Sequence, residues 1–405
     1  MRLACIDVGS SSIAVAIANF SAALRPTVIG RGWAPAAGVE RGDIVDLNGA
    51  GRALAAALEA AERAAGCRVG QAIVATGGRE LTATLRRGQL TLGRDPVTVT
   101  RKHATRAVNS IVQGGPEPGQ EILHVIPRSF WLDGAHLVRN PLGMPAARLE
   151  VEAHVVAASS AAIRNVIRCV QDQGLEVREL VAAPLATAEA SLTAQEREAG
   201  VLLVDLGMGS TGAVAFTQGT PAATALIPVG GQQITGDIAI VLRVSLRQAE
   251  QLKLSYGRAQ AGNLPDQLVD VPDDEAIGLE PVSQRLLCDV IEARLEETFE
   301  QVMQAVAATG FAEPLPAGVV LAGGGASLPD VAAVARRLFG LPARAATVSV
   351  LGAPVAALAP SWGTAAGLLS WVQRGRPDLL PEGAARTTRA NVGRLARLLR
   401  PLGGG

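Results

Sequence analysis

Two aspartates, Asp7 and Asp205, occupy the same kind of place in the sequence. Each follows a short apolar run, residues 3–6 or 201–204, that is typical of a buried strand. Each precedes a turn rich in glycine and hydroxyl side chains, and a second apolar run follows that turn. Glycine lets backbone N–H groups approach phosphate oxygens, and a carboxylate can hold Mg²⁺ through the water shell of the ion. Two such hairpins facing each other would clamp a triphosphate from both sides.

A third glycine-rich turn lies late in the chain, in the stretch VVLAGGGASLPDV at residues 319–331. It also follows an apolar run, and it could contact the adenosine part of a nucleotide. One such hairpin alone is weak evidence, because many glycine-rich hairpins are only tight turns. Three of them in this order resemble the loops of the actin-like ATPase superfamily. That resemblance implies an α/β fold with two lobes around a nucleotide cleft.

The composition is that of a globular protein with a sizeable core. The 405 residues are 48% hydrophobic and 18% charged, and this length suits two lobes better than one domain. The net charge is zero, which argues against a nucleic-acid partner. The four cysteines contain no CxxC pair and the four histidines show no ligand spacing, so we expect no zinc site and a reduced, cytoplasmic setting. No run approaches the ~20 apolar residues of a membrane span.

The elements that must position these loops follow in order along the chain. We predict a first lobe from residues 1–95 and 176–199, with a compact helix–strands–helix module inserted at 96–175. Residues 200–226 and 309–358 are predicted to form the body of the second lobe, 227–308 its outer subdomain, and 359–372 a closing helix of the first lobe. Asp46 or Asn48 is expected to cap a helix at 47–66, and Thr235 to cap one beginning near Gly236. Glu250 and Lys253 stand three residues apart and therefore share a helix face.

The end of the chain differs in kind from the rest. A linker at residues 373–386 precedes residues 387–405, which are predicted to form an amphipathic helix. The apolar positions of such a helix extend over only ~17 Å, too little to cross a bilayer, but the helix could lie among the headgroups of anionic lipids. The alternative is a surface helix that packs on its own domain. The apolar positions are Val392, Leu395, Leu398, Leu399 and Leu402, and the basic positions are Arg394, Arg397 and Arg400.

Taken nearly end to end, the sequence resembles the FtsA family of bacterial cell-division proteins. The resemblance is carried by LACIDVGSSSIAVAIA at residues 3–18, LHVIPRSFWLDG at 123–134, NPLGMPAARLEVEAHVV at 140–156, EREAGVLLVDLGMGSTGAVAF at 196–216, IPVGGQQITGDIAIVLR at 227–243, AEQLKLSYG at 249–257 and IEARLEETF at 291–299. The insertion between the two phosphate loops is the most telling part, because actin, sugar kinases and heat-shock chaperones lack it. In the family's nomenclature this insertion is subdomain 1C and interrupts subdomain 1A of the first lobe, while the second lobe consists of subdomain 2A and the outer subdomain 2B.

The resemblance implies a peripheral membrane protein with an actin-like fold. Such a protein binds ATP with Mg²⁺, polymerises head to tail on the cytoplasmic face of the cell membrane at the division septum, and tethers FtsZ filaments through the FtsZ C-terminal peptide. It also recruits later divisome proteins. The peptide would dock on the subdomain that contains residues 282–308, where Arg285 and Arg294 are the expected contacts for an acidic partner.

Matching the family motifs residue by residue assigns the nucleotide site. Asp7 and Asp205 would order Mg²⁺ through water. The complete set is Asp7, Gly9, Ser10 and Ser11 in phosphate loop one; Asp205, Gly207, Gly209, Ser210 and Thr211 in phosphate loop two; Glu250 and Lys253 at the ribose and base; and Gly323, Gly324, Gly325 and Ser327 in the adenosine loop.

Two departures from the superfamily pattern bear on catalysis. The second phosphate loop commonly reads DxGGGTxD, whereas Met208 lies inside the turn here and Gly212 replaces the last aspartate. The related filament protein MreB positions the attacking water with a glutamate before a proline, and Ala183 precedes Pro184 here. Hydrolysis needs a group that orients the water. We therefore predict ATP binding with very slow or absent hydrolysis, and we identify no catalytic residue. Asp237 or Glu189 could substitute.

Three other interpretations remain open at this point. A small-molecule kinase of the same superfamily would need a carboxylate base between the lobes, and no convincing candidate is found. PilM, the actin-like protein of type IV pilus assembly, shares IDVGSSS-like and IPVGG-like motifs but needs no lipid-binding tail. A nucleotide-free scaffold with a decayed site would be expected to lose the two aspartates and the adenosine glycines, which this sequence retains.

Overall fold

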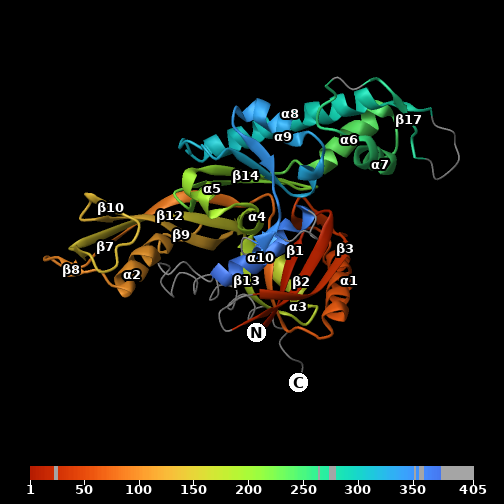
Figure 1. Cartoon of the computed structure of the whole chain (residues 1–405). Coiled ribbons are helices and arrows are strands. Elements are labelled where there is room, and N and C mark those ends of the chain that lie inside the picture. The colour runs from red at the N-terminus through yellow and green to blue at the C-terminus, as the bar shows by residue number, and fades with distance from the viewer. Residues whose placement is uncertain (22–25, 263–264, 273–279, 351–352, 355–359, 375–405) are drawn as a thin grey trace.

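Two five-stranded sheets with the same strand order form the body of the molecule (Figure 1). The computed structural model describes residues 1–21, 26–262, 265–272, 280–350, 353–354 and 360–374. The first sheet has the order β3–β2–β1–β6–β13, with β1 Arg2–Val8, β2 Ser12–Phe20, β3 Pro26–Pro35, β6 Gln71–Thr76 and β13 Glu176–Ala182. The second has the order β16–β15–β14–β19–β20, with β14 Val201–Leu206, β15 Thr211–Thr217, β16 Thr220–Ile227, β19 Val319–Ala322 and β20 Ala343–Ala345.

The pairing within each sheet places one glycine-rich hairpin beside a parallel strand. β1 pairs antiparallel with β2 and parallel with β6, and β14 pairs antiparallel with β15 and parallel with β19. The carboxyl ends of β1 and β14 therefore carry Asp7 and Asp205 to the edges at which the β1–β2 and β14–β15 turns begin. The two predicted strand–aspartate–turn–strand units are confirmed.

Helices cover both faces of each sheet because alternate residues of the central strands point to opposite sides. Ala4 and Ile6 belong to the core under α1 (Leu47–Ala65) and α3 (Ser160–Gln171), whereas Leu3 and Cys5 pack with α10 (Gly363–Arg374). α4 (Ala183–Ser191) packs between the lobes, since it contributes to the first core beside Val201 and Leu203 of β14. The outer face of the second sheet packs against α8 (Gln284–Ala308) and α9 (Val331–Phe339).

The remaining elements are short or peripheral. α1 begins after Asp46, whose side chain accepts a hydrogen bond from the Asn48 amide, and ends at Gly66 in the left-handed conformation with φ 64°. The other bounds are α5 Ala194–Ala199, α6 Gly231–Leu242, α7 Leu246–Tyr256, η1 Gly324–Ser327, η2 Pro360–Trp362, β4 Val39–Glu40, β5 Asp43–Ile44, β17 Leu268–Val269, β18 Val282–Ser283, β21 Ser349–Val350 and β22 Ala353–Pro354.

The inserted module is a four-stranded sheet that starts earlier in the chain than residue 96. Its order is β10–β9–β12–β7, with β7 Thr82–Thr91, β9 Gln120–Leu132, β10 His136–Val138 and β12 Arg148–Ser159, and with β8 Val97–Thr98 and β11 Pro145–Ala146 as a separate pair. β7 was not predicted from the sequence, because most of its residues are exposed and no apolar run marks it. α2 (Arg101–Val112) covers this sheet, with Thr100 as its N-cap. α3 packs on the core of the first lobe, which also includes Leu123 of β9 and Val156 of β12.

α6 begins at Gly231, earlier than the predicted start near Gly236. The expected cap at Thr235 is wrong, because Thr235 lies inside this helix. The true N-cap is Gly230, whose amide donates to Gln233 Oε1 at 2.8 Å. Among the described residues, no helix is both long and apolar enough to cross a membrane. The predicted linker, apart from its first two residues, and the amphipathic tail at 387–405 lie outside the described residues.

Candidate functional site

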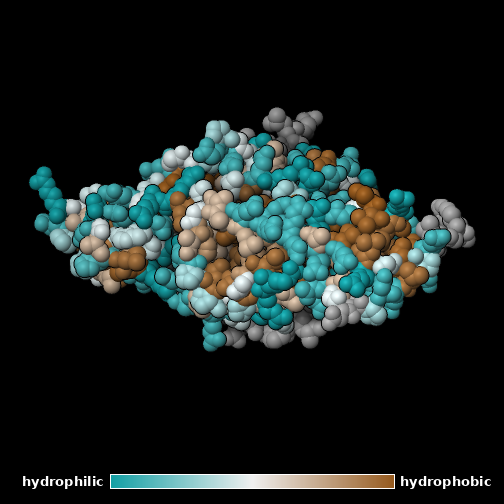
Figure 2. Space-filling view, turned by 90° about the horizontal axis from the view of Figure 1, so that it is seen from above, coloured by the Kyte–Doolittle hydropathy of each residue, from teal (hydrophilic) through white to brown (hydrophobic). Residues whose placement is uncertain are grey.

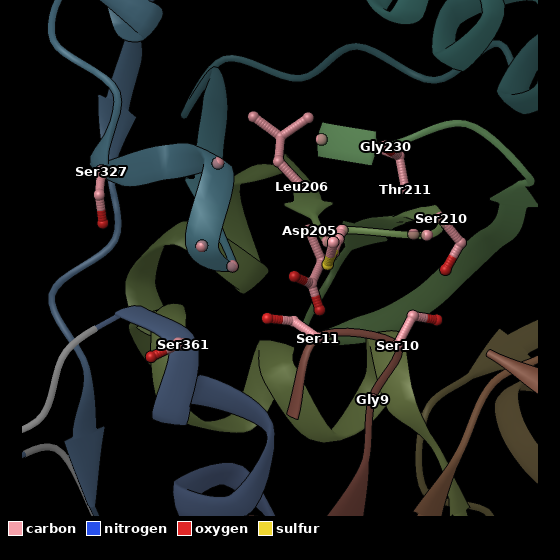
Figure 3. Close-up of a pocket in the computed structure, with 18 of the residues that line it drawn as sticks. Gly9, Ser10, Ser11, Asp205, Leu206, Ser210, Thr211, Gly230, Ser327 and Ser361 are labelled. Atoms are coloured by element: carbon pink, nitrogen blue, oxygen red, sulfur yellow. The ribbon is translucent and has the colours of Figure 1, made fainter. Parts of the chain in front are cut away.

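A cavity of about 560 Å³ lies between the two sheets, and all fifteen predicted nucleotide residues line it. Phosphate loop one enters from the β1–β2 turn, and phosphate loop two from the β14–β15 turn. In Figure 3, Ser10 and Ser11 lie across the cleft from Asp205 and Ser210, while Ser327 lies at its far side. Sequence positions more than 300 residues apart, such as Asp7 and Gly323, thus meet in one site.

The two phosphate loops are built alike and touch each other. The Gly9 amide donates to the Ser12 carbonyl at 3.1 Å, and the Gly207 amide donates to the Ser210 carbonyl at 3.0 Å. A Cβ atom built on Gly209 would lie 2.6 Å from Ser10 Oγ, so only glycine fits at this crossing. This close approach of backbones leaves no room for a side chain where phosphate oxygens would meet amide groups.

The tip of the β4–β5 hairpin lies where the two phosphate loops touch, and it was not predicted from the sequence. The Gly42 amide donates to Ser10 Oγ at 2.9 Å, and Arg41 lies against Gly209. Arg41 has φ 50°, a left-handed conformation that a residue with a Cβ seldom adopts. The Arg-Gly dipeptide was the only signal of a tight turn at this position.

Asp7 and Asp205 are partly buried and electrostatically coupled. Burial raises the pKa of Asp7 to about 7, the charge of Asp205 adds to this rise, and a hydrogen bond with Thr364 opposes it. Burial also raises the pKa of Asp205, against a hydrogen bond from Thr187. The Thr187 hydroxyl donates to Asp205 Oδ2 at 2.6 Å and lies 2.9 Å from the Thr364 hydroxyl. A divalent cation would relieve this repulsion, so the carboxylate pair fits a magnesium site.

The adenosine loop closes directly against phosphate loop two. Gly323 has φ 78°, and a Cβ built on it would lie 2.4 Å from Asp205 Oδ1 and 2.6 Å from the Leu206 carbonyl oxygen. A side chain at position 323 would therefore displace the aspartate. The conformation and the close approach both require glycine here.

Glu250 and Lys253 form a polar network at the other wall of the cleft. Lys253 Nζ donates to Glu250 Oε2 at 2.6 Å, to Thr235 Oγ1 at 2.7 Å and to the Gly231 carbonyl at 3.0 Å. These acceptors occupy all three ammonium donors of Lys253. Thr235 also hydrogen-bonds Glu250. The network fixes α6 against α7 and presents Glu250 to the cleft.

The two carboxylates considered as substitutes for a water-orienting group point elsewhere. Asp237 pairs with Arg294 through Oδ2–Nε at 2.5 Å, and Glu189 pairs with Arg197 at 2.7 Å and with Arg374 at 2.9 Å. Neither residue lines the cavity. Pro184 lies against Gly212, where a Cβ would come within 2.7 Å of Pro184 Cγ. An aspartate at position 212 would not fit beside this proline.

Six hydroxyl residues that line the cleft were not among the predicted site residues: Ser12, Thr187, Ser255, Thr298, Ser361 and Thr364. Thr187 lies on α4, and Thr364 lies in the first turn of α10. A threonine inside a helix gives no motif, so only the packing of α4 against α10 reveals it. Of the two arginines expected to bind a partner, Arg285 is exposed, and Arg294 is held by Asp237 and Glu297.

Comparisons with known proteins agree on one family. The family model described as cell division protein FtsA matches residues 202–367, and the model of the SHS2 domain inserted in FtsA matches residues 78–157. The cell division protein FtsA of Borreliella burgdorferi is 31% identical over 367 residues, covering 90% of this chain and 89% of that protein. The FtsA of Pseudomonas aeruginosa is 32% identical over 371 residues, covering 90% and 88%.

Solved structures show the fold. The PilM–PilN type IV pilus biogenesis complex matches with a TM-score of 0.64 at 16% identity, covering 93% of this chain and 99% of that one. MreB5 of Spiroplasma citri bound to AMPPNP matches with a TM-score of 0.55 at 12% identity, covering 91% and 94%. These likenesses confirm the predicted actin-like fold with its inserted subdomain.

Proposed function

Because the chain belongs to the FtsA family of cell division proteins, we propose that it binds ATP with Mg²⁺ and links FtsZ filaments to the cytoplasmic face of the cell membrane at the division septum. It polymerises there head to tail and recruits later divisome proteins. The observation that carries the nucleotide part is the convergence of all fifteen predicted residues on one cavity. The AMPPNP-bound MreB5, which has the same fold, supports a nucleotide at this place.

The residues present fit a magnesium nucleotide. Asp7 and Asp205 would hold the ion through water, the amides of both phosphate loops would face the phosphates, and Glu250 with the glycines at 323–325 would bound the nucleoside end. Magnesium would supply charge neutralisation of the phosphates. Calorimetric titration with ATP in the presence of Mg²⁺ tests this, and Asp205→Asn should weaken binding at least tenfold. Equal affinity of the variant and the wild type would contradict the proposal.

We expect hydrolysis to be very slow, because the cleft lacks a carboxylate at positions 183 and 212 and both substitutes are ion-paired elsewhere. Single-turnover measurement with radiolabelled ATP is the direct check. Turnover faster than about one per minute, which is still well below common enzyme rates, would contradict this expectation.

The outer end of the second lobe supports a peptide-docking role. Figure 2 shows hydrophobic side chains gathered at the end of the molecule where α6, α7 and β17 lie. Exposed apolar patches mark interaction surfaces, and Arg285 stands next to Leu286 at the start of α8. We define the apolar end surface as Ile240, Val241, Leu246, Leu254, Leu268 and Leu286.

Binding of a fluorescent FtsZ C-terminal peptide tests this docking. Arg285→Ala and Leu254→Ser should each weaken it more than fivefold, whereas Leu137→Ser on the inserted sheet should not. Leu254 and Leu137 are 75% and 61% exposed, so the control is matched in residue type and exposure. Arg294→Ala is expected to act mainly through Asp237, its ion-pair partner. Equal binding by all variants would exclude this surface.

Membrane attachment is proposed for residues 387–405. Flotation with liposomes containing anionic lipid should be lost when these residues are deleted, and it should weaken with rising salt. Electron microscopy on lipid monolayers with ATP, with and without the FtsZ peptide, tests polymerisation. Flotation that survives the deletion would count against the tail.

A further inference from the structure

Two hydroxyl groups connect the aspartates of the two phosphate loops. The Thr187 hydroxyl donates to Asp205 at 2.6 Å and lies 2.9 Å from the Thr364 hydroxyl. Thr364 in turn lies beside Asp7 and acts to lower the pKa of that carboxyl group. The four side chains form one continuous chain from the end of β1 in the first lobe to the end of β14 in the second. We name this the threonine bridge.

The bridge is buried and its position is set by backbone. Thr187 is 1% exposed and Thr364 is 9% exposed, so water cannot readily replace either hydroxyl. Their helices cross so closely that a Cβ on Gly367 of α10 would lie 1.7 Å from the Ala186 carbonyl oxygen of α4. Gly363, next to Thr364, lies against Thr187 Cγ2, where a Cβ would be 3.5 Å away. The helix crossing thus fixes both hydroxyls before any ligand binds.

This placement distinguishes the bridge from ordinary helix hydroxyls. A buried threonine in a helix commonly donates to the carbonyl four residues before it. Thr187 instead donates across the cleft wall to a carboxylate, and hydrogen bonds to charged acceptors are stronger than neutral ones. Sites that order an ion through carboxylates depend on such supporting contacts to hold each oxygen in place.

Resting on the proposed nucleotide function, we propose that Thr187 and Thr364 are positioning residues that hold Asp7 and Asp205 in the orientation required to order a divalent cation. Their role lies in the cation-dependent part of nucleotide binding. The nucleotide contacts of the glycine loops do not depend on them.

The test compares Thr187→Val and Thr364→Val, which remove the hydroxyl at nearly constant volume, with Thr187→Ser and Thr364→Ser, which keep it. A fluorescent ATP analogue is titrated at several Mg²⁺ concentrations and again in EDTA. The valine variants should need at least tenfold more Mg²⁺ for half-maximal enhancement of binding, while affinity in EDTA stays within twofold. The serine variants should stay within threefold of wild type in both measurements.

Two further measurements make the result decisive. Because the bridge is one chain, the double variant that combines Thr187→Val with Thr364→Val should be little worse than either single variant. Thermal unfolding without metal or nucleotide checks the fold. If a valine variant does not fold, Thr187→Ala against Thr187→Ser carries the same comparison, since these variants differ only by the hydroxyl.

The outcomes separate the two proposals. If wild type binds the analogue with Mg²⁺ and the valine variants show the same Mg²⁺ dependence, the positioning role is overturned while the nucleotide function stands. Equal losses of affinity with Mg²⁺ and in EDTA would also overturn it, because they indicate general damage to the cleft. If wild type binds no nucleotide, the proposed nucleotide function falls, and the positioning role falls with it.

Discussion

Burial and charge repulsion set the state of the aspartate pair. Burial and the charge of Asp205 raise the pKa of Asp7 to about 7, although a hydrogen bond with Thr364 favours the charged form of Asp7. Asp7 therefore holds a proton at a higher pH than an ordinary aspartate does. A cation in the cleft would replace this proton as the positive charge between the carboxylates.

Asp7→Asn tests this state through stability. The folded-state pKa of Asp7 is raised, so its contribution to stability is complete below the ordinary value of 3.8 and is lost as pH rises to about 7. The variant has no carboxyl group to titrate at position 7. Without metal, its free energy of unfolding should therefore exceed that of wild type by roughly 1–3 kcal/mol at pH 8, but by little at pH 4. Denaturant unfolding in EDTA at both pH values measures the difference. A gain independent of pH would refute the assignment, and the variant should bind Mg²⁺–ATP poorly.

Gly212 and Pro184 are predicted to be coupled. Gly212→Ala places a Cβ 2.7 Å from Pro184 Cγ and should cost about 1–3 kcal/mol of unfolding free energy. Pro184→Ala in the same chain should recover part of that cost, giving a non-zero coupling energy in a double-mutant cycle. Gly70→Ala is the control, because a Cβ there has nothing within 4 Å. Strict additivity of the two changes would show that the cost of Gly212→Ala does not arise from its contact with Pro184.

At the scale of elements, the crossing of α4 and α10 joins the lobes behind the cleft. α4 packs on β14 and β15 of the second sheet, and it packs on α10 at Ala186. Outside the cleft, Glu189 of α4 forms ion pairs with Arg197 and with Arg374 of α10. The Arg197 and Glu189 side chains are only 3% and 8% exposed, so removing Glu189 would leave the buried charge of Arg197 without its ion-pair partner.

Gly367→Ala should break this crossing. The new Cβ would lie 1.7 Å from the Ala186 carbonyl oxygen, so the helices must separate, and we expect a loss of about 3 kcal/mol or more. Gly363→Ala on the same helix meets only an ordinary contact at 3.5 Å and should change stability by less than ~1 kcal/mol. Chemical denaturation of both variants makes the comparison. Similar stabilities would mean that α10 can shift without cost.

At the scale of the whole molecule, the inserted sheet contacts both lobes. Arg128 of β9 donates to Thr217 at 2.9 Å and to Glu313 at 3.0 Å, both in the second lobe. His154 of β12 lies 2.8 Å from the Thr224 hydroxyl of β16. The insertion interrupts the first lobe in the sequence, but its sheet also contacts the second lobe. It should therefore restrict the motion of one lobe relative to the other.

Acid should weaken the contact between the inserted sheet and the second lobe. Burial lowers the pKa of His154 to about 4, with the charge of Arg128 adding to the effect, and burial likewise lowers that of His124 to about 3. Stability from these neutral histidines is present above the unfolded value of 6.5 and is lost as pH falls below it. His154→Gln should therefore lose less stability than wild type between pH 7 and pH 5, measured by denaturant unfolding. Parallel curves would contradict a titrating role for His154.

The sequence by itself determined the local units of this protein. Apolar runs, aspartates and glycine turns identified both hairpins, the cap of α1 at Asp46 was among the predicted positions, and motif likeness identified the family, because these signals reside in neighbouring residues. Tertiary structure alone decided the rest. β7 joins the inserted sheet through pairing with β12, and Thr187 reaches Asp205 through a helix crossing. Such contacts depend on how separate elements pack, and no local pattern records that packing.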